Sequence, residues 1–152
     1  MKKLLLLTAM CIPLCLFAQN GPQNEKISPR LQAAIDNSTA NDFIKAYVLL
    51  SDRVDILGLK AQLDARNADL HERTRTVITE LRAKAEQTQG PLLQWLKEQG
   101  ARELRPHWIT NIVFADLTPA MLEELSRRPD VEQLDINAPL QPDEHQLVCS
   151  PP

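Results

Sequence analysis

The chain has 152 residues with 17 basic and 20 acidic side chains, so its formal net charge is −3 at pH 7. An acidic chain offers no electrostatic attraction to nucleic acid or to an anionic membrane. Its four glycines, Gly21, Gly58, Gly90 and Gly100, are widely separated. No glycine-rich loop can therefore bring backbone N–H groups to a phosphate, which excludes the nucleotide-binding classes, and we expect no cofactor.

The first 18 residues are typical of a secretory signal peptide. Lys2 and Lys3 precede an apolar run from Leu4 to Phe17, and Ala18 is the small residue before the expected cleavage site. The run is shorter than the roughly 20 residues that a membrane span requires. Cleavage would take the formal charge from −3 to −5 and predicts a secreted or periplasmic protein. Only Cys149 of the three cysteines would remain, so the mature chain would hold no internal disulfide.

Residues 19–41 are expected to form a leader with one short helix. Ser28-Pro29 predicts where that helix begins, because a hydroxyl cap is followed by a proline whose missing N–H is harmless there. The domain itself is expected over residues 42–137. It starts with the nearly continuous apolar run Phe43–Leu50, which predicts a strand buried on much of both faces.

Two helical segments are expected next. The first begins at Asp52–Asp55. The second is the longest periodic segment in the chain, with apolar residues every three or four positions from Leu70 to Ala85 and charged residues between them. This spacing predicts an amphipathic helix. Gly90-Pro91 is expected to interrupt it, after which the helix resumes and ends at Gly100.

Two strands are expected after these helices. The first covers Glu103–Ile109 and contains Pro106, which lacks a ladder donor and favours a sheet edge. Thr110-Asn111 is expected to be a tight turn. The second strand, Ile112–Leu117, is again mostly apolar.

Thr118-Pro119 repeats the pattern of a hydroxyl cap followed by proline and predicts a last helix, which Pro129 ends. Val131–Ile136 is expected to be an exposed edge strand, because its apolar residues alternate imperfectly with Glu132 and Asp135. Residues 138–152 are rich in proline and are expected to form an extended tail without a core of their own.

The order strand, helix, strand, strand, helix, strand predicts an α+β domain of the ferredoxin-like βαββαβ type. Its antiparallel sheet has the first and third strands in the centre, both helices on one face, and an extended helical insertion between the first two strands. The central strands carry apolar residues on both sides, so one apolar face is left uncovered and is expected to bind a partner. The residues expected there are Tyr47, Leu49, Val113 and Ala115.

Three stretches resemble the propeptides of secreted bacterial subtilisin-like serine proteases: Ala46–Leu50, Arg105–Asn111 with its Trp-Ile-x-Asn pattern, and Arg128–Leu134, which opens with Arg-Pro-Asp-Val. The long helical insertion is similar to that of the longer bacterial variants. In that family the open sheet face packs on two surface helices of the protease, and the propeptide assists folding of the protease and then inhibits it. The resemblance implies a subtilisin-like protease as partner. It also implies that the segment after the last strand enters the active-site cleft of the protease. In this chain that segment consists of Asn137, Ala138, Pro139, Leu140 and Gln141.

No stretch of the chain resembles the aspartate, histidine or serine motifs of the protease itself. His71, His107 and His145 are far apart and fall on different expected elements, so neither a metal site nor a nucleophile with its base is indicated. We therefore expect a non-catalytic protein. It would be either a stand-alone inhibitor acting in trans or a truncated precursor, and a general exported interaction module is the alternative.

Two further alternatives are less well supported by the sequence. An acylphosphatase-like enzyme shares this strand order and would use Arg53 and Asn111, but Ser51–Asp55 has no glycine and carries two carboxylates that would repel a phosphate. RNA binding on the sheet requires stacking aromatic and basic residues on the central strands, and Tyr47 and Phe114 are too few. The negative net charge and the expected export also argue against it.

Overall fold

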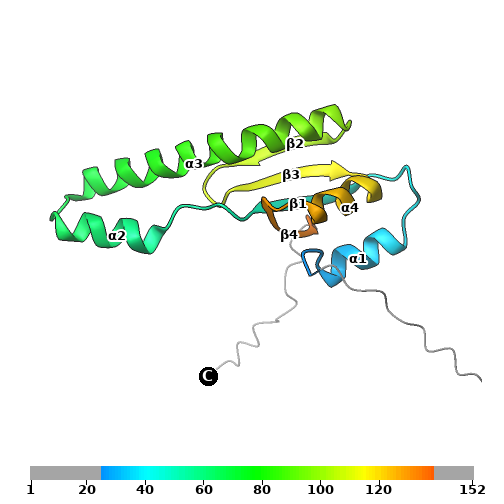
Figure 1. Cartoon of the computed structure of the whole chain (residues 1–152), viewed down its shortest axis with the longest axis horizontal. Helices are drawn as coiled ribbons and strands as arrows, with labels where there is room; N and C mark the ends of the chain where they lie inside the picture. Colours follow the sequence, from blue (N-terminus) through cyan, green and yellow to red (C-terminus); the bar gives the residue numbers. More distant parts are fainter. Residues whose placement is uncertain (1–24, 139–152) are drawn as a thin grey trace, which may run out of the picture.

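The computed structural model describes residues 25–138, which form an α+β domain of four helices and a four-stranded antiparallel sheet (Figure 1). The signal peptide expected at 1–18 and the residues from 139 onward lie outside the described part. The elements in chain order are α1 (Pro29–Asp36), β1 (Ile44–Leu50), α2 (Ile56–Ala65), α3 (Leu70–Glu98), β2 (Arg102–His107), β3 (Ile112–Leu117), α4 (Pro119–Arg127) and β4 (Val131–Ile136).

Each helix begins at a residue whose side chain caps it. Ser28, Asp55, Asp69 and Thr118 each accept a hydrogen bond from the backbone N–H three residues later. Such a cap stabilises a helix by about 1 kcal/mol because it satisfies a donor that has no partner within the helix. The caps predicted at Ser28 and Thr118 are confirmed, and α1 and α4 both start with proline.

The break predicted at Gly90-Pro91 is wrong, because α3 runs through both residues as one helix of 29 residues. A proline inside a helix removes a hydrogen bond and costs about 3 kcal/mol. Beyond that point the helix is held on the sheet by Leu92 and Leu96, both fully buried. Each buried leucine contributes about 2 kcal/mol, which offsets the cost of the proline.

The strands lie in the order β2-β3-β1-β4, so the two most apolar strands occupy the centre of the sheet. In the register of β1 and β3, Tyr47 lies opposite Phe114, Val48 opposite Val113, and Leu49 opposite Ile112. Directly opposed residues point to the same face of a sheet. The register therefore sorts the apolar residues of both strands onto two distinct faces.

One face of the sheet carries the core and is covered by helices. All inward residues of the two central strands are buried: Ile44, Ala46, Val48 and Leu50 of β1, and Val113, Ala115 and Leu117 of β3. They pack in one cluster with side chains from α1, α3 and α4, namely Leu31, Leu92, Leu96, Met121, Leu122 and Leu125. The two helices α3 and α4 lie along this face (Figure 1).

The prediction that Val113 and Ala115 belong to the uncovered face is therefore wrong. Their side chains are 0% and 3% exposed, and they lie opposite Val48 and Ala46 in the core. Both alternating sets of β3 are apolar, so hydrophobicity alone does not separate the two faces. Ile112 and Phe114 are the β3 residues that share a face with Tyr47 and Leu49.

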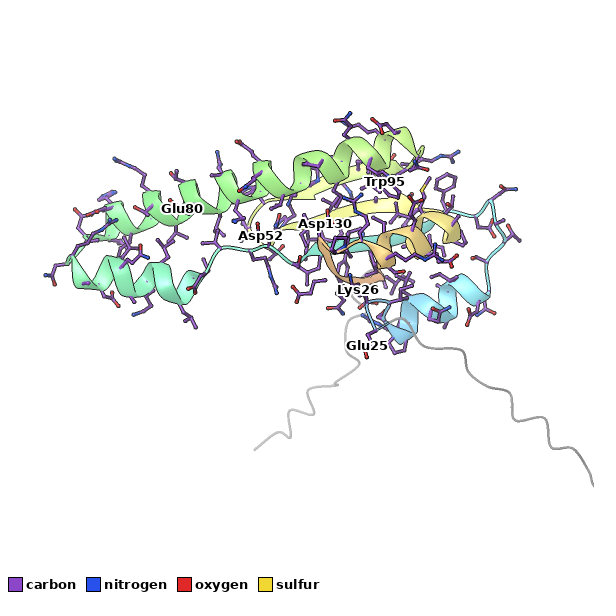
Figure 2. The ribbon with its side chains drawn as sticks, viewed as in Figure 1. Glu25, Lys26, Asp52, Glu80, Trp95 and Asp130 are labelled. Carbon is purple, nitrogen blue, oxygen red and sulfur yellow. The ribbon has the colours of Figure 1, made fainter. Side chains whose placement is uncertain are left out.

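The outer side of β4 is also covered, in contrast to the exposed edge predicted. The Ser28 N–H donates to the Leu134 carbonyl at 2.9 Å, and the Leu134 N–H donates to the Lys26 carbonyl at 2.7 Å. Ile27 thereby forms a parallel bridge with Leu134. Figure 2 labels Lys26 where this leader meets the sheet. Among the described strands, β2 is consequently the edge whose outer side no other strand pairs.

The helix α2 and the first half of α3 form a hairpin that projects beyond the sheet (Figure 1). Its small interior consists of Leu63 and Ala68, both buried. Arg73 fastens the turn between the helices, since its guanidinium donates to the Ala68 carbonyl at 2.8 Å and to the Asp64 carboxylate. The hairpin therefore has its own local contacts and extends the domain past the end of β1.

Candidate functional site

The candidate site is the sheet face opposite the core, which we call the open face. Its centre consists of Tyr47, Leu49, Ile112 and Phe114, all of them half-buried and none of them in the core cluster. The rings of Tyr47 and Phe114 meet edge to face, with centroids 6.2 Å apart and an interplanar angle of 68°. This geometry is favourable for aromatic pairs and gives the centre a defined shape.

Two arginines and a histidine border the open face along β2. Arg105 lies opposite Phe114 in the register, and its guanidinium carbon is 6.0 Å from the centroid of that ring. His107 lies opposite Ile112 and meets the ring of Phe114 edge to face at 6.4 Å. At the far end of the face, the guanidinium carbon of Arg102 is 3.9 Å from the ring centroid of Phe43.

Asp135 borders the open face on the β4 side, where the leader covers its side chain. It lies opposite Tyr47, is 5% exposed, and accepts hydrogen bonds from the Ser28 hydroxyl, from Arg30 at 2.6 Å and from the Ile136 N–H at 2.7 Å. Burial by itself would raise the pKa of Asp135, but these hydrogen bonds outweigh it and hold the pKa below 3.8. Burial and the nearby Asp135 carboxylate together raise the pKa of Tyr47. The surface free for a partner is thus the part of the open face over β1, β3 and β2.

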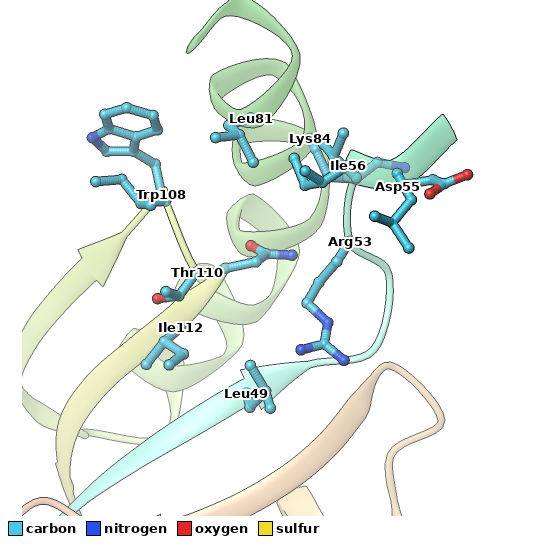
Figure 3. A pocket seen from close by; sticks show the side chains of 13 residues that line it. Leu49, Arg53, Asp55, Ile56, Leu81, Lys84, Trp108, Thr110 and Ile112 are labelled. Atoms are coloured by element: carbon cyan, nitrogen blue, oxygen red, sulfur yellow. The ribbon is translucent and has the colours of Figure 1, made fainter. Parts of the chain in front are cut away.

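A pocket of about 630 Å³ continues the open face past the ends of β1 and β3 (Figure 3). Leu49 and Ile112 belong to both the open face and this pocket. Three lining residues, Ile56, Leu57 and Ile109, are 46%, 80% and 52% exposed. Since residues 25–138 expose five large hydrophobic side chains in all, most of that exposed apolar surface gathers around this pocket.

The charged groups around the pocket already have partners in the chain. Arg53 donates to both carboxylate oxygens of Glu132, at 2.8 and 2.6 Å. Lys84 on α3 lies 2.9 Å from the carboxylate of Asp52, and Asp55 caps α2. Paired charges attract a charged ligand only weakly, so the pocket suits an uncharged apolar group.

Asn111 is the second residue of the acylphosphatase-like alternative, and its side chain also forms hydrogen bonds within the chain. It is buried, its amide nitrogen donates to the Asp52 carbonyl at 2.8 Å, and its amide oxygen accepts from Gln89 at 2.9 Å. Arg53 and Asn111 line the same pocket, but Arg53 is held by Glu132. Arg53 and Asn111 therefore fix the loop after β1 and the turn before β3. Among the described residues, the two side chains do not form the set of free donors that a phosphate site needs.

The other predicted site residues are only partly described. Asn137 continues the pairing past β4, as its N–H donates to the Lys45 carbonyl at 2.8 Å, and Ala138 is exposed. Pro139, Leu140 and Gln141 lie outside the described residues, as does His145. His71 is exposed on α3 and His107 on β2. Within residues 25–138 no three histidine, cysteine, aspartate or glutamate side chains gather closely enough to hold a metal ion.

Sequence reasoning missed Ile112 and Phe114, although a signal for them was present. Lys45 lies on the same side of its strand as Tyr47 and Leu49, and Asp116 on the same side as Ile112 and Phe114. A charged residue marks the solvent side of a strand, so these two positions identify which set faces outward. The pocket carries no such signal, because α2, α3 and the β2–β3 turn meet there only in the folded chain.

No family model, curated protein or solved structure matches this chain. None of the helices in residues 25–138 combines the length and the apolar content that a membrane span needs. An apolar centre with a polar border is the usual anatomy of a protein interface.

Proposed function

We propose that residues 42–137 form a propeptide-like domain that binds a subtilisin-like serine protease, inhibits it and assists its folding. The domain is a βαββαβ unit of the ferredoxin-like type, with the projecting hairpin of α2 and α3 as its helical insertion. Residues 1–18 act as a signal peptide, so the protein works outside the cytoplasm, as a secreted or periplasmic protein.

The observation that carries this proposal is the apolar centre of the open face. Tyr47, Leu49, Ile112 and Phe114 lie side by side on two central strands and remain half-exposed. Covering apolar surface with a partner releases about 25 cal/mol for each Å² removed from water, whereas leaving it in water favours aggregation. A rigid sheet presents these side chains at little entropic cost.

The direction of the chain after β4 fits an inhibitor that inserts its tail. Asn137 is still paired with Lys45, and Ala138 follows as an exposed residue at the end of the sheet. A peptide that leaves a sheet in an extended conformation can continue as a strand and pair with the edges of a protease cleft. Asn137, Ala138, Pro139, Leu140 and Gln141 form this segment.

The test measures how residues 19–152 slow peptide hydrolysis by a purified secreted subtilisin-like protease. We expect slow, tight inhibition by the whole segment, and at least about a hundredfold weaker inhibition when the chain ends at Ile136, because the backbone pairing in the cleft is then lost. Absence of inhibition by the whole segment would reject the proposal. Inhibition unchanged by the truncation would remove the tail from the mechanism.

A matched pair of substitutions tests the open face separately from the tail. Leu49→Asp places a carboxylate in the centre of the open face, whereas Leu70→Asp places one at a leucine that is 78% exposed at the start of α3. We expect only Leu49→Asp to weaken inhibition, by at least about tenfold. Equal effects of the two substitutions would show that the open face does not contact the protease.

A second candidate is a general exported interaction module without a protease partner. The observation that favours it is the pocket with Ile56, Leu57 and Ile109 at its rim, since this apolar surface lies beyond the open face. If Leu57→Asp weakened binding to a partner while Phe114→Asp, on the open face but outside the pocket, did not, the pocket would be the primary site and this second function would be favoured.

A further inference from the structure

The open face ends along β2 in cationic side chains that form no salt bridge among the described residues. Six of the ten arginines in residues 25–138 form salt bridges, and the remaining four are Arg75, Arg82, Arg102 and Arg105. Arg102 and Arg105 lie on the open face. Lys45, opposite Asp116 in the register, also lacks a carboxylate oxygen within 4 Å among these residues.

Aromatic rings hold both of these guanidinium groups in place. Arg102 lies over Phe43 at 3.9 Å, and Arg105 over Phe114 at 6.0 Å. Stacking occupies one flat side of a guanidinium and leaves its N–H edge available, and that edge matches the two oxygens of a carboxylate. Because the rings restrict the side chains beforehand, less conformational entropy is lost when a carboxylate binds.

Docking on the open face makes these charges decisive for the choice of partner. A surface that covers Phe43 and Phe114 also removes water from Arg102 and Arg105, and a desolvated cation without a partner is strongly unfavourable. On the opposite side of the face, Asp135 and Arg30 already neutralise each other. On the β2 side the single carboxylate of Asp116 faces three cations, Lys45, Arg102 and Arg105, so the requirement for a further counter-charge falls on that side.

We propose that the partner surface carries carboxylates opposite Arg102 and Arg105, beside an apolar patch that covers the centre of the open face. This inference rests on the proposed function, since it specifies the partner of the same surface. The carboxylates orient the partner on the sheet and discriminate against surfaces of equal apolarity that lack them.

Nucleic acid is the other ligand that arginine and aromatic side chains suggest, and the face favours protein. Asp116 lies between Lys45 and Arg102 in the sheet and would repel a phosphate. Leu49 and Ile112 supply half of the apolar centre, and neither can stack on a base. The whole chain is also acidic, with a formal charge of −3.

The test is a titration of ¹⁵N-labelled residues 19–152 with two amphipathic helical peptides, followed by NMR. The peptides share one apolar face, flanked in one by glutamates and in the other by lysines. At about 20 mM salt we expect the glutamate peptide to bind at least about tenfold more tightly and to shift the signals of β1, β2 and β3. The preference should fall to about twofold in the double variant Arg102→Gln, Arg105→Gln, and persist in the control Arg75→Gln, whose arginine lies exposed on α3.

Equal binding of the two peptides, binding of neither, or tighter binding of a single-stranded RNA oligonucleotide would overturn the inference. The protease assay separates this failure from failure of the proposed function. Inhibition without a preference for the glutamate peptide would remove only the carboxylate requirement. A preference for the glutamate peptide without inhibition would leave the carboxylate requirement in place and remove the protease as the partner.

Discussion

Tyr47 and Phe114 lie directly opposite each other on β1 and β3, on the side of the sheet that the core does not use. Their neighbours in sequence, Val48 and Val113, form the equivalent pair on the core side and are fully buried. The chain therefore presents two apolar sheet faces that differ by a single residue step along each strand. Only one of them is filled by the chain's own helices.

This difference predicts opposite consequences for substitutions at adjacent residues. Val113→Asp buries a carboxylate without a partner and should destabilise the fold by at least about 4 kcal/mol. Phe114→Asp places the same group on the open face and should change stability by no more than about 1.5 kcal/mol, while it weakens partner binding at least about tenfold. Urea denaturation followed by circular dichroism measures the stability of both variants. A Phe114→Asp variant that unfolds like Val113→Asp would place Phe114 in the core.

At Asn111, the stability cost of backbone strain can be measured separately from the cost of losing side-chain hydrogen bonds. Its φ of 53° lies in the left-handed region, and its side chain bridges Asp52 and Gln89. Both Asn111→Ala and Asn111→Gly lose these hydrogen bonds, at a cost of about 2–3 kcal/mol, but only alanine adds strain of about 1–2 kcal/mol. Urea midpoints should therefore rank wild type first, glycine second and alanine last. Equal stability of the two variants would contradict the strained backbone.

The lowered pKa of Asp135 predicts that the free energy of unfolding falls at acidic pH. Its pKa in the folded protein lies below 3.8, so its stabilising contribution is fully present above that pH and is lost as the pH falls through the folded pKa. Asp135→Asn should cost about 1–3 kcal/mol at pH 7, because the charged hydrogen bonds from Ser28 and Arg30 are weakened. The difference between the two proteins should narrow as the pH drops below 3.8. Urea denaturation at a series of pH values measures it, and a constant difference from pH 7 to pH 2 would contradict this role.

Alanine is expected to have different effects at the glycines of α2 and α3, Gly58 and Gly90. A Cβ added at Gly90 in α3 meets no atom within 4 Å, so Gly90→Ala should stabilise the protein by about 1 kcal/mol. A Cβ added at Gly58 would lie 2.3 Å from the Asp55 carboxylate oxygen, and this carboxylate caps α2. Gly58→Ala should therefore displace the cap, and this loss of about 1 kcal/mol cancels the similar gain from alanine in a helix, so stability should stay nearly unchanged. Thermal unfolding of both variants tests this, and an equal stabilisation of both would contradict it.

Much of the fold can be predicted from local patterns, and the exceptions have physical causes. The caps at Ser28 and Thr118 and the apolar central strands β1 and β3 follow from the sequence. The continuity of α3 through Pro91 does not, because packing of distant leucines on the sheet outweighs the local cost of proline. Burial of Asp135 depends in the same way on the leader lying along β4, a contact between residues about a hundred positions apart.

Only half of the candidate site can be read from the sequence. Tyr47 and Leu49 lie on the open face as the alternation in β1 predicts, but Val113 and Ala115 belong to the core. A strand that is apolar on both sides reveals its faces only through its charged residue, which is Asp116 in β3, or through its register with a neighbour. The cationic border and the pocket depend on three-dimensional contacts, since Arg102 meets Phe43 across the sheet.

The most direct test of the central claim is an NMR footprint of a catalytically inactivated subtilisin-like protease on methyl-labelled residues 19–152. The open face predicts that the methyl signals of Leu49 and Ile112 shift or broaden on binding, while those of Val113 and Ala115, which face the core from β3, stay unchanged. A footprint confined to α3 and α4, or no footprint at protease concentrations of about 100 μM, well above the Kd expected of a specific complex, would contradict the claim that this face binds the protease.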